Sequence, residues 1–343
     1  MLRMMHCPNE EYCLICSFNE RYKCCYWRYL KGEVECSKKC ECRRLCRSRP
    51  DIKIKALRVN LTEIPDFVKS KRFQKTCNGF SDLFIPEIKP YRGELKEAIN
   101  SVKKADVKSL TISLLHFITP KGRFNKRFYR VKRAGGLHSF LNFDGKIILT
   151  TDIPNILCDR IDADRLCLYV ESLKPDCITT FDTYYHDDQP TFITQIKMYE
   201  TLEKTVRLSD KIKSPVIGLA IGPSNKLFEW YARCLVKLGC NLLAIPCFES
   251  RSRGSKKAGL GKIAERIQMI KSIHPDIQIL LLSCSPSYPK VYGANYYSSY
   301  ASWWMVDGEN SFKKRVEKLK KYKRDAERYS KQRLVRKNGR GTL

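Results

Sequence analysis

The sequence lacks three features that would indicate a membrane protein or a common nucleotide-binding fold. No apolar run reaches the ~18–20 residues that a membrane-spanning helix needs. The first residues, MLRMMHCPNEEYC, lack the apolar stretch of a secretory signal, so we expect no membrane partner and a cytoplasmic location. The phosphate-binding patterns GxGxxG and GxxxxGK[ST] are also missing, which argues against the open sheets that use them.

Acidic residues are scarce relative to basic ones. The 343 residues include 65 Lys and Arg but only 36 Asp and Glu, which gives a net charge of +29 at pH 7. A highly charged thermophilic surface would normally be rich in Glu as well as Lys. The hydrophobic content of 43% is that of a globular chain rather than a disordered one. We therefore predict a folded protein whose partner is a polyanion, in particular nucleic acid.

Cysteines are concentrated near the N-terminus, where nine of the 17 fall within the first 46 residues. In a reducing cytosol such clusters indicate metal binding more often than disulfides. We predict a cysteine-rich module over 1–50 that binds structural zinc, with an iron–sulfur cluster or disulfides as alternatives. The eight predicted ligands form two groups, Cys7, Cys13, Cys16 and Cys24, then Cys36, Cys40, Cys42 and Cys46.

Beyond this module the sequence alternates between short apolar runs and amphipathic helical patterns. Apolar runs without polar alternation suit parallel strands that are covered on both faces. We therefore predict an α/β fold, a TIM-like (β/α)8 barrel, over 109–308, after a segment at 51–108 that links the module to the barrel or forms the entry to it. Six strands are expected at 110–115, 146–151, 177–181, 216–221, 241–247 and 277–284. The remaining two should lie near 291–297 and within 51–107.

The last segment, 309–343, is predicted to be a basic helix and tail. Residues 311–343 hold 14 basic and 3 acidic side chains. An apolar stripe predicts docking by one face, and it consists of Phe312, Val316, Leu319, Tyr322, Ala326 and Tyr329. The basic remainder would face nucleic acid or, alternatively, only solvent. A second basic and aromatic segment, 121–133, predicts a strand-binding channel, with an exposed hairpin as the alternative.

Two carboxylates follow predicted strands. Asp152 ends KIILTTD and Asp182 ends CITTFD. In α/β barrels the chemistry lies at the carboxyl ends of the strands. Two carboxylates in one pocket could serve as nucleophile and as acid/base at a sugar C1′. The simpler interpretation is that each caps the next helix.

Other residues at the same predicted rim suit a base-binding pocket. Gly218 and Gly222 would let a ligand approach the backbone closely. Tyr184 could stack on a base, although aromatic residues are more often part of a core. Arg251 and Arg253 could hold phosphates, or simply occupy a solvated loop.

The order of these segments resembles the tRNA-guanine transglycosylase superfamily, and most of all its DpdA (deoxypurine in DNA protein A) branch. The resemblance spans about 110–305 and rests on LHSFLNFDGKIILTTD, YVESLKPDCITTFDTYYHDD and SPVIGLAIGPSNKLFEWYARCLVKLGCNLLAIPC. It implies a TIM barrel in which guanine leaves its sugar and a 7-deazaguanine such as preQ0 replaces it. It matches Asp152 to the early strand-end aspartate, Asp182 to the base-recognising aspartate, and Gly218 to Gly222 to the strand lining the base pocket.

The chain departs from the family pattern in two places. The family's catalytic aspartate follows a late strand, but the stretch GANYYSSYASWW at 293–304 has no carboxylate. The tRNA enzymes also bind zinc near the C-terminal end of the barrel, whereas here the cysteines cluster at the N-terminus. Asp152 would then be the nucleophile, or the protein would bind without turnover.

The sequence thus predicts a pentosyltransferase that inserts a 7-deazaguanine base into nucleic acid, DNA rather than tRNA. Such activity could require a protein partner. One alternative is a non-catalytic nucleic-acid-binding protein, which the missing late carboxylate favours. The other is an unrelated TIM-barrel enzyme acting on an anionic small molecule, although such an enzyme would need no basic C-terminal helix.

Overall fold

The structure is a computed structural model that describes most of the chain after residue 59. The described residues are 60–89, 95–151, 153, 157, 161–183, 191–247, 256–284, 293–299, 304–305 and 310–338. Within them, the side chains at 191–193, 256–260 and 330–338 are not described. The cysteine-rich module predicted at 1–50, with its eight predicted metal ligands, lies outside the described residues.

Eight parallel strands form one sheet that is nearly closed into a barrel. Their order is β1-β8-β7-β6-β5-β4-β3-β2, so the first strand lies beside the last. The backbone N–H of Ile88 donates to the carbonyl of Thr111 on β2 at 2.9 Å, which joins the two sheet edges. The strands are β1 (Phe84–Pro86), β2 (Ser109–Ser113), β3 (Lys146–Thr150), β4 (Cys177–Thr179), β5 (Val216–Leu219), β6 (Leu242–Pro246), β7 (Gln278–Cys284) and β8 (Tyr296–Ser299).

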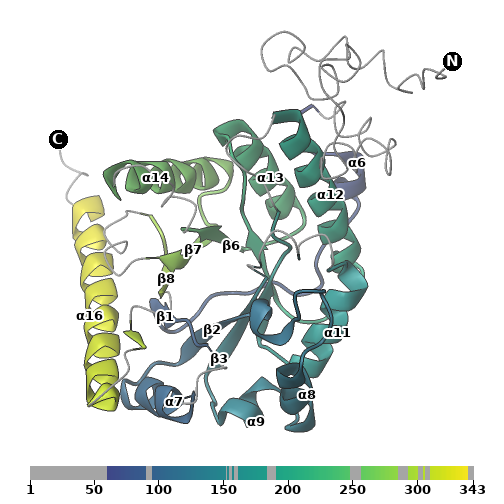
Figure 1. The fold of residues 1–343 in the computed structure, drawn as a ribbon. Helices are drawn as coiled ribbons and strands as arrows, with labels where there is room; N and C mark the ends of the chain where they lie inside the picture. The colour runs from purple at the N-terminus through teal and green to yellow at the C-terminus, as the bar shows by residue number, and fades with distance from the viewer. Residues whose placement is uncertain are drawn as a thin grey trace, which may run out of the picture.

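Helices connect the strands and surround them, as Figure 1 shows. This alternation of buried parallel strands and covering helices fits an α/β (β/α)8 barrel, the predicted fold class. The helices are α6 (Asp66–Lys69), α7 (Leu95–Lys104), α8 (Lys126–Arg133), α9 (Leu137–Leu141), α11 (Ala163–Leu173), α12 (Thr191–Ser209), α13 (Asn225–Lys237), α14 (Lys256–Ile273) and α16 (Ser311–Asn338), with a 3-10 turn η1 (Leu114–Phe117) after β2. In the part of the chain that the structure describes, no helix has the length and apolar character to cross a membrane.

The six strands predicted from apolar runs are all present. The other two also lie where they were expected, β8 near 291–297 and β1 within 51–107. All of β4, β5 and β6 is buried, because the barrel interior covers one face and the helices cover the other.

A segment before β1 crosses the N-terminal end of the barrel. The N–H of Cys77 donates to the carbonyl of Val216 at the start of β5, at 3.1 Å. Two residues later Gly79 has a φ of +101°, and a Cβ there would lie 2.3 Å from the hydroxyl of Tyr296 on β8. Only glycine fits both the backbone conformation and the space. Residues 76–81 therefore pass across the N-terminal ends of β5 and β8, and we call them the N-terminal plug.

Helix α16 docks on α7 through a charged contact as well as an apolar one. Arg315 is completely buried and lies 3.1 Å from Glu97, and the hydroxyl of Ser311 donates to the same carboxylate at 2.8 Å. Val316, Leu319 and Ala326 are buried, as the stripe predicted, and Tyr322 is half-buried. Phe312 was wrongly placed in the stripe. It is 39% exposed, because Ser311 and Arg315 occupy the buried face at that end of the helix.

The basic and aromatic segment 121–133 begins in a short turn closed by an antiparallel bridge between Ile118 and Phe124, and it is helical from Lys126 onward. Asn125 caps α8, since its side-chain oxygen accepts from the N–H groups of Arg127 and Phe128 at 3.0 Å. The ring of Phe124 stacks on Phe128 with centroids 4.1 Å apart, and Tyr169 of α11 meets both rings edge-on. Phe124 and Phe128 thus pack within the protein rather than presenting their faces to a bound strand.

Candidate active site

Threonine hydroxyls join the carboxyl ends of three neighbouring strands. Just after β3, the N–H of Thr151 donates to the hydroxyl of Thr179 on β4 at 2.8 Å. The hydroxyl of Thr180 accepts from the N–H of Leu219 on β5, also at 2.8 Å. All three threonines are buried. These side-chain bonds hold the backbones of the three strands together at this end of the barrel.

Asp182 lies two residues beyond these bonds at the end of β4. Its side chain is half-buried, and one carboxylate oxygen accepts from the N–H of Thr183 at 2.8 Å. Thr183 is in turn buried and bonded through its hydroxyl to Thr201 of α12. The carboxylate is therefore held at the C-terminal rim by α12 and by the threonine bonds below it. This is the position at which barrels carry catalytic groups.

Several predicted site residues cannot be placed. Asp152, which directly follows Thr151 in the sequence, lies outside the described residues, and so do Tyr184, Arg251 and Arg253. Their predicted roles stay predictions. Among the residues that the structure does describe, no group of three or more His, Cys, Asp or Glu side chains is placed to hold a metal ion.

Gly218 and Gly222 are on β5 and just after it, next to the strand that leads to Asp182. A Cβ on Gly222 would lie 2.6 Å from the backbone of Phe228, so this glycine lets α13 begin close to the strand. A Cβ on Gly218 would meet Leu243 and Cys240. Packing within the protein thus accounts for both glycines. The predicted ligand contact at each stays a prediction.

Buried Arg266 of α14 lies at the same end of β5. Its guanidinium donates to the carbonyl of Gly222 and lies over the ring of Phe228, 4.8 Å from the centroid. Arg266 is 2% exposed. It therefore fixes one positive charge near the rim and aligns the turn after β5.

Glu87 is a buried carboxylate at the end of β1 that the sequence analysis missed. Its backbone N–H donates to the carbonyl of Ser299 on β8 at 3.0 Å, and it forms a parallel bridge with Thr111. The hydroxyls of Thr111 and Ser298 lie 2.9 Å apart. Because β1 lies between their strands, the two side chains can meet only across the barrel interior, so both point inward. Bridge partners in parallel strands face the same side, which places Glu87 inward as well. The only sequence signal was a Pro-Glu pair in a weakly patterned segment.

The carboxyl end of β7 also carries an irregular backbone. Ser283 is buried and has a φ of +52°, a left-handed conformation that is uncommon outside glycine. The pairing of β7 with β8 shifts register between Leu281 and Cys284. Bulges and strained residues are concentrated at functional rims of barrels. Nothing in the run LLLSC indicates this conformation.

The β8 stretch does not supply the carboxylate that the family pattern expects. Asn295 precedes β8, where its side-chain oxygen accepts from the N–H of Ile279 at 2.9 Å and its own N–H donates to the Ile279 carbonyl. Asn295 therefore pairs the starts of β7 and β8, at the end of the barrel opposite to Asp182. Among the residues that the structure describes, Glu87 at the end of neighbouring β1 places a carboxylate in the adjoining part of the rim.

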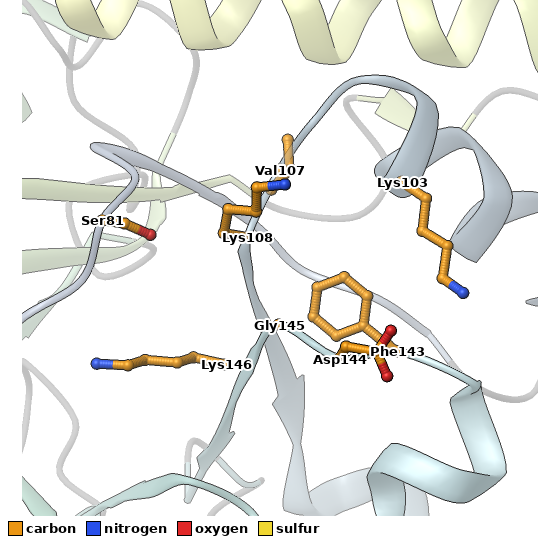
Figure 2. A pocket seen from close by; sticks show the side chains of 8 residues that line it. All are labelled: Ser81, Lys103, Val107, Lys108, Phe143, Asp144, Gly145 and Lys146. Carbon is orange, nitrogen blue, oxygen red and sulfur yellow. The ribbon is translucent and has the colours of Figure 1, made fainter.

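A basic hollow lies at the N-terminal end of the barrel. It encloses about 430 Å³, and Figure 2 shows Lys103 and Lys146 extending to opposite sides of it. Its lining residues are Ser81, Lys103, Val107, Lys108, Phe143, Asp144, Gly145 and Lys146. Because the strands begin at this end, the hollow is separate from the rim that carries Asp182 and Glu87.

Searches against known proteins add no functional assignment. No family model matches the chain, and no curated protein matches it. Among solved structures, one match is a cube-shaped, highly porous protein cage designed by fusing symmetric oligomeric domains. That match has 12% identity and a TM-score of 0.44, and it covers 76% of this chain and 77% of the other.

Proposed function

We propose that this chain exchanges a guanine base in a polynucleotide, DNA rather than tRNA, for a 7-deazaguanine base. The observation that carries the proposal is the Asp182 carboxylate, half-buried and held at the C-terminal rim of a nearly closed parallel barrel. Chemistry at a sugar C1′ needs a carboxylate in such a protected place. A stacked base cannot enter a barrel, so the guanine must first be flipped out of its strand.

The exchange needs two groups with different tasks. One carboxylate attacks C1′ and displaces guanine, and the incoming base then displaces the carboxylate from the same carbon. A second group carries a proton to the departing base and removes one from the incoming base. In this proposal Asp152 or Asp182 is the nucleophile. The buried Glu87 is a further acid/base candidate, because it faces the barrel interior beside the strand end that lacks a carboxylate.

Contact with the polynucleotide is assigned to the exposed surface of α16. The buried face of this helix is fixed by Arg315 and Glu97, so the opposite face is held toward solvent. That face carries exposed basic side chains along most of its described length, namely Lys313, Lys314, Lys320, Lys321, Arg324 and Arg328. Such a row neutralises phosphates irrespective of sequence.

An exchange assay with matched variants tests the proposal. Protein purified with its metal is incubated with duplex DNA, single-stranded DNA or tRNA containing labelled guanine, together with unlabelled preQ0. Digested nucleosides are then analysed by mass spectrometry. Wild type should release label and create a 7-deazaguanine nucleoside in DNA. Asp182→Asn should lower the exchange rate at least ~100-fold, the order of effect of losing an acid/base group.

Asp164→Asn is the matched control, because this carboxylate is exposed on α11, where it pairs with Lys211 on the surface. It should exchange at the wild-type rate. Retention of label by wild type in all three polymers, with binding confirmed in parallel, would overturn the proposed reaction. If Asp182→Asn exchanges bases at the wild-type rate, the assignment of Asp182 to the site would be overturned, but the proposed reaction would not.

A non-catalytic nucleic-acid-binding protein is the second candidate. It is favoured by the stretch 293–304, which contains no carboxylate. Such a protein would bind DNA with strong salt dependence and leave every base unchanged. Zinc at the eight N-terminal cysteines is compatible with both candidates and remains part of the proposal.

A further inference from the structure

Two buried thiols from distant parts of the chain meet at the N-terminal end of the barrel. The sulfur of Cys177, the first residue of β4, lies 3.1 Å from the sulfur of Cys77 in the N-terminal plug. Both are free cysteines, and they are 4% and 2% exposed. The contact joins positions 100 residues apart in the sequence. Neither residue belongs to the rim that carries the proposed base exchange.

The surroundings of the pair favour a thiolate on one of the two sulfurs. The Cys177 thiol donates a hydrogen bond to Cys77, and this bond lowers the pKa of Cys77 below its usual value. The backbone of Gly79 and the charge of Lys146 lower the pKa further, whereas burial opposes them. The pKa of Cys177 is raised, first by the same hydrogen bond and then by burial. Cys77 therefore suits the role of the attacking thiolate, and Cys177 suits the role of the resolving cysteine.

Lys146 contacts the N-terminal plug and also lines the basic hollow. Its ammonium donates to the carbonyl of Gly79 at 3.1 Å and lies 5.7 Å from the ring centroid of Phe80. Lys146 and Ser81 also line the basic hollow (Figure 2). The hollow therefore borders the N-terminal plug at Ser81, four residues after Cys77.

We propose that Cys77 and Cys177 are a peroxide-sensitive pair that closes to a disulfide. The Cys77 thiolate attacks one oxygen of hydrogen peroxide, forming an S–O bond as the O–O bond breaks, and the departing hydroxide takes a proton to become water. The sulfur of Cys177 then attacks the Cys77 sulfenic acid. The S–S bond forms, the S–O bond breaks, and the Cys177 proton leaves with the hydroxyl as a second water. The two thiols lose two electrons, and the peroxide gains them.

Closure requires little movement, since the sulfurs must approach by only about 1 Å to reach the ~2.05 Å of a disulfide. The bond would tether the N-terminal plug to β4. The plug already contacts β5 through Val216 and β8 through Tyr296. Oxidation would therefore cross-link the N-terminal end of the barrel and raise the free energy of unfolding.

Peptide mapping of the full-length protein tests this pair directly. Reduced protein is exposed to dilute hydrogen peroxide, quenched with catalase, denatured and alkylated. Trypsin with Glu-C then separates Cys167 from Cys177 by cleaving after Glu171. We expect one linked species that joins the Cys77 and Cys177 peptides, two hydrogen masses below their sum, with loss of both alkylated peptides. Dithiothreitol should restore them.

Two serine variants provide the controls. In Cys77→Ser the linked species should vanish, and Cys177 should remain alkylatable. Cys240→Ser removes a thiol that is equally buried and whose pKa is raised by that burial. This variant should still form the disulfide between Cys77 and Cys177. If either variant fails to fold, the wild-type map alone decides. The proposal would be overturned if Cys77 and Cys177 stayed reduced at peroxide concentrations that oxidise other cysteines of the chain. It would also be overturned if either one formed a disulfide with a third cysteine.

Discussion

At the scale of single residues, the barrel contains polar groups whose ionisation is controlled by burial. His116 in η1 is 7% exposed, and its pKa is lowered from 6.5 to about 4. Burial is the largest cause, and the charges of Arg127 and Lys89 act in the same direction. The folded state therefore holds this imidazole neutral through the mildly acidic range, whereas the unfolded chain takes up a proton.

This difference predicts a loss of stability in mild acid. The contribution of His116 is fully present above pH 6.5 and is lost as the pH falls toward 4, because only the unfolded state gains a proton in that interval. The expected cost at about pH 4 is roughly 3 kcal/mol. Urea unfolding of wild type and His116→Gln at several pH values measures it. The two curves should diverge below pH 6.5, while exposed His274→Gln should follow wild type.

The candidate site residues differed in how far the sequence could reveal them. Asp182 was predictable because it follows a short, largely β-branched run, CITTF, and the strands of a barrel end at its rim. Glu87 was not predictable, because β1 has only three residues, one of them a proline, which is too short to show the alternation of a strand. The conformation of Ser283 depends on pairing between β7 and β8, which no local pattern records.

At the scale of elements, α16 and α7 are joined by an ion pair beside the buried apolar stripe of α16. Arg315 is fully buried, and Glu97 is the carboxylate within 3.1 Å of it. Removing the acid would leave a buried charge without this partner, which costs more than losing a surface pair.

We therefore predict that Glu97→Ala lowers the free energy of unfolding by about 3 kcal/mol. Glu327→Ala, an exposed acid on α16 itself, should change it by no more than about 0.5 kcal/mol. Chemical denaturation of both variants provides the comparison. Equal effects would mean that the docking of α16 does not depend on the buried pair.

The apolar stripe of α16 was visible in the sequence, but its details were not. Spacing by three and four residues correctly selected Val316, Leu319 and Ala326. The same rule included Phe312, because periodicity cannot show that a buried arginine will occupy the adjoining position. Likewise the basic run at 121–133 gave no indication that Phe124 and Phe128 stack on each other.

At the scale of the whole molecule, a net charge of +29 attracts polyanions, and the question is where they bind. If α16 is the contact, the variant Lys320→Glu, Lys321→Glu, Arg324→Glu should weaken DNA binding and reduce the slope of log affinity against log salt by about 3. These side chains are exposed, so the fold should be unaffected.

The control reverses the same number of exposed charges elsewhere, with Lys226→Glu and Lys237→Glu on α13 and Lys213→Glu between α12 and β5. Fluorescence anisotropy over a salt series compares the two triple variants. A smaller change in the control is expected. The same loss in both would show that the attraction is diffuse and would contradict a contact on α16.

The barrel class followed from the sequence because the central strands are buried on both faces and are therefore rich in apolar and β-branched residues. How the sheet closes did not follow. Closure depends on β1 and β8, which are short, and on side chains such as Thr111 and Ser298 that meet across the interior. Those contacts join positions that are 187 residues apart, beyond the reach of any local pattern.

The place of β1 between β2 and β8 has a consequence for synthesis on the ribosome. The first strand cannot acquire its second neighbour until residue 299 has emerged, and α7 stays uncovered until α16 follows. During that interval the nascent chain carries an open sheet edge and an exposed apolar helix face, the features that promote wrong association. A message truncated before α16 would therefore yield a protein that chaperones and proteases recognise as unfinished, even though most of its strands had been made.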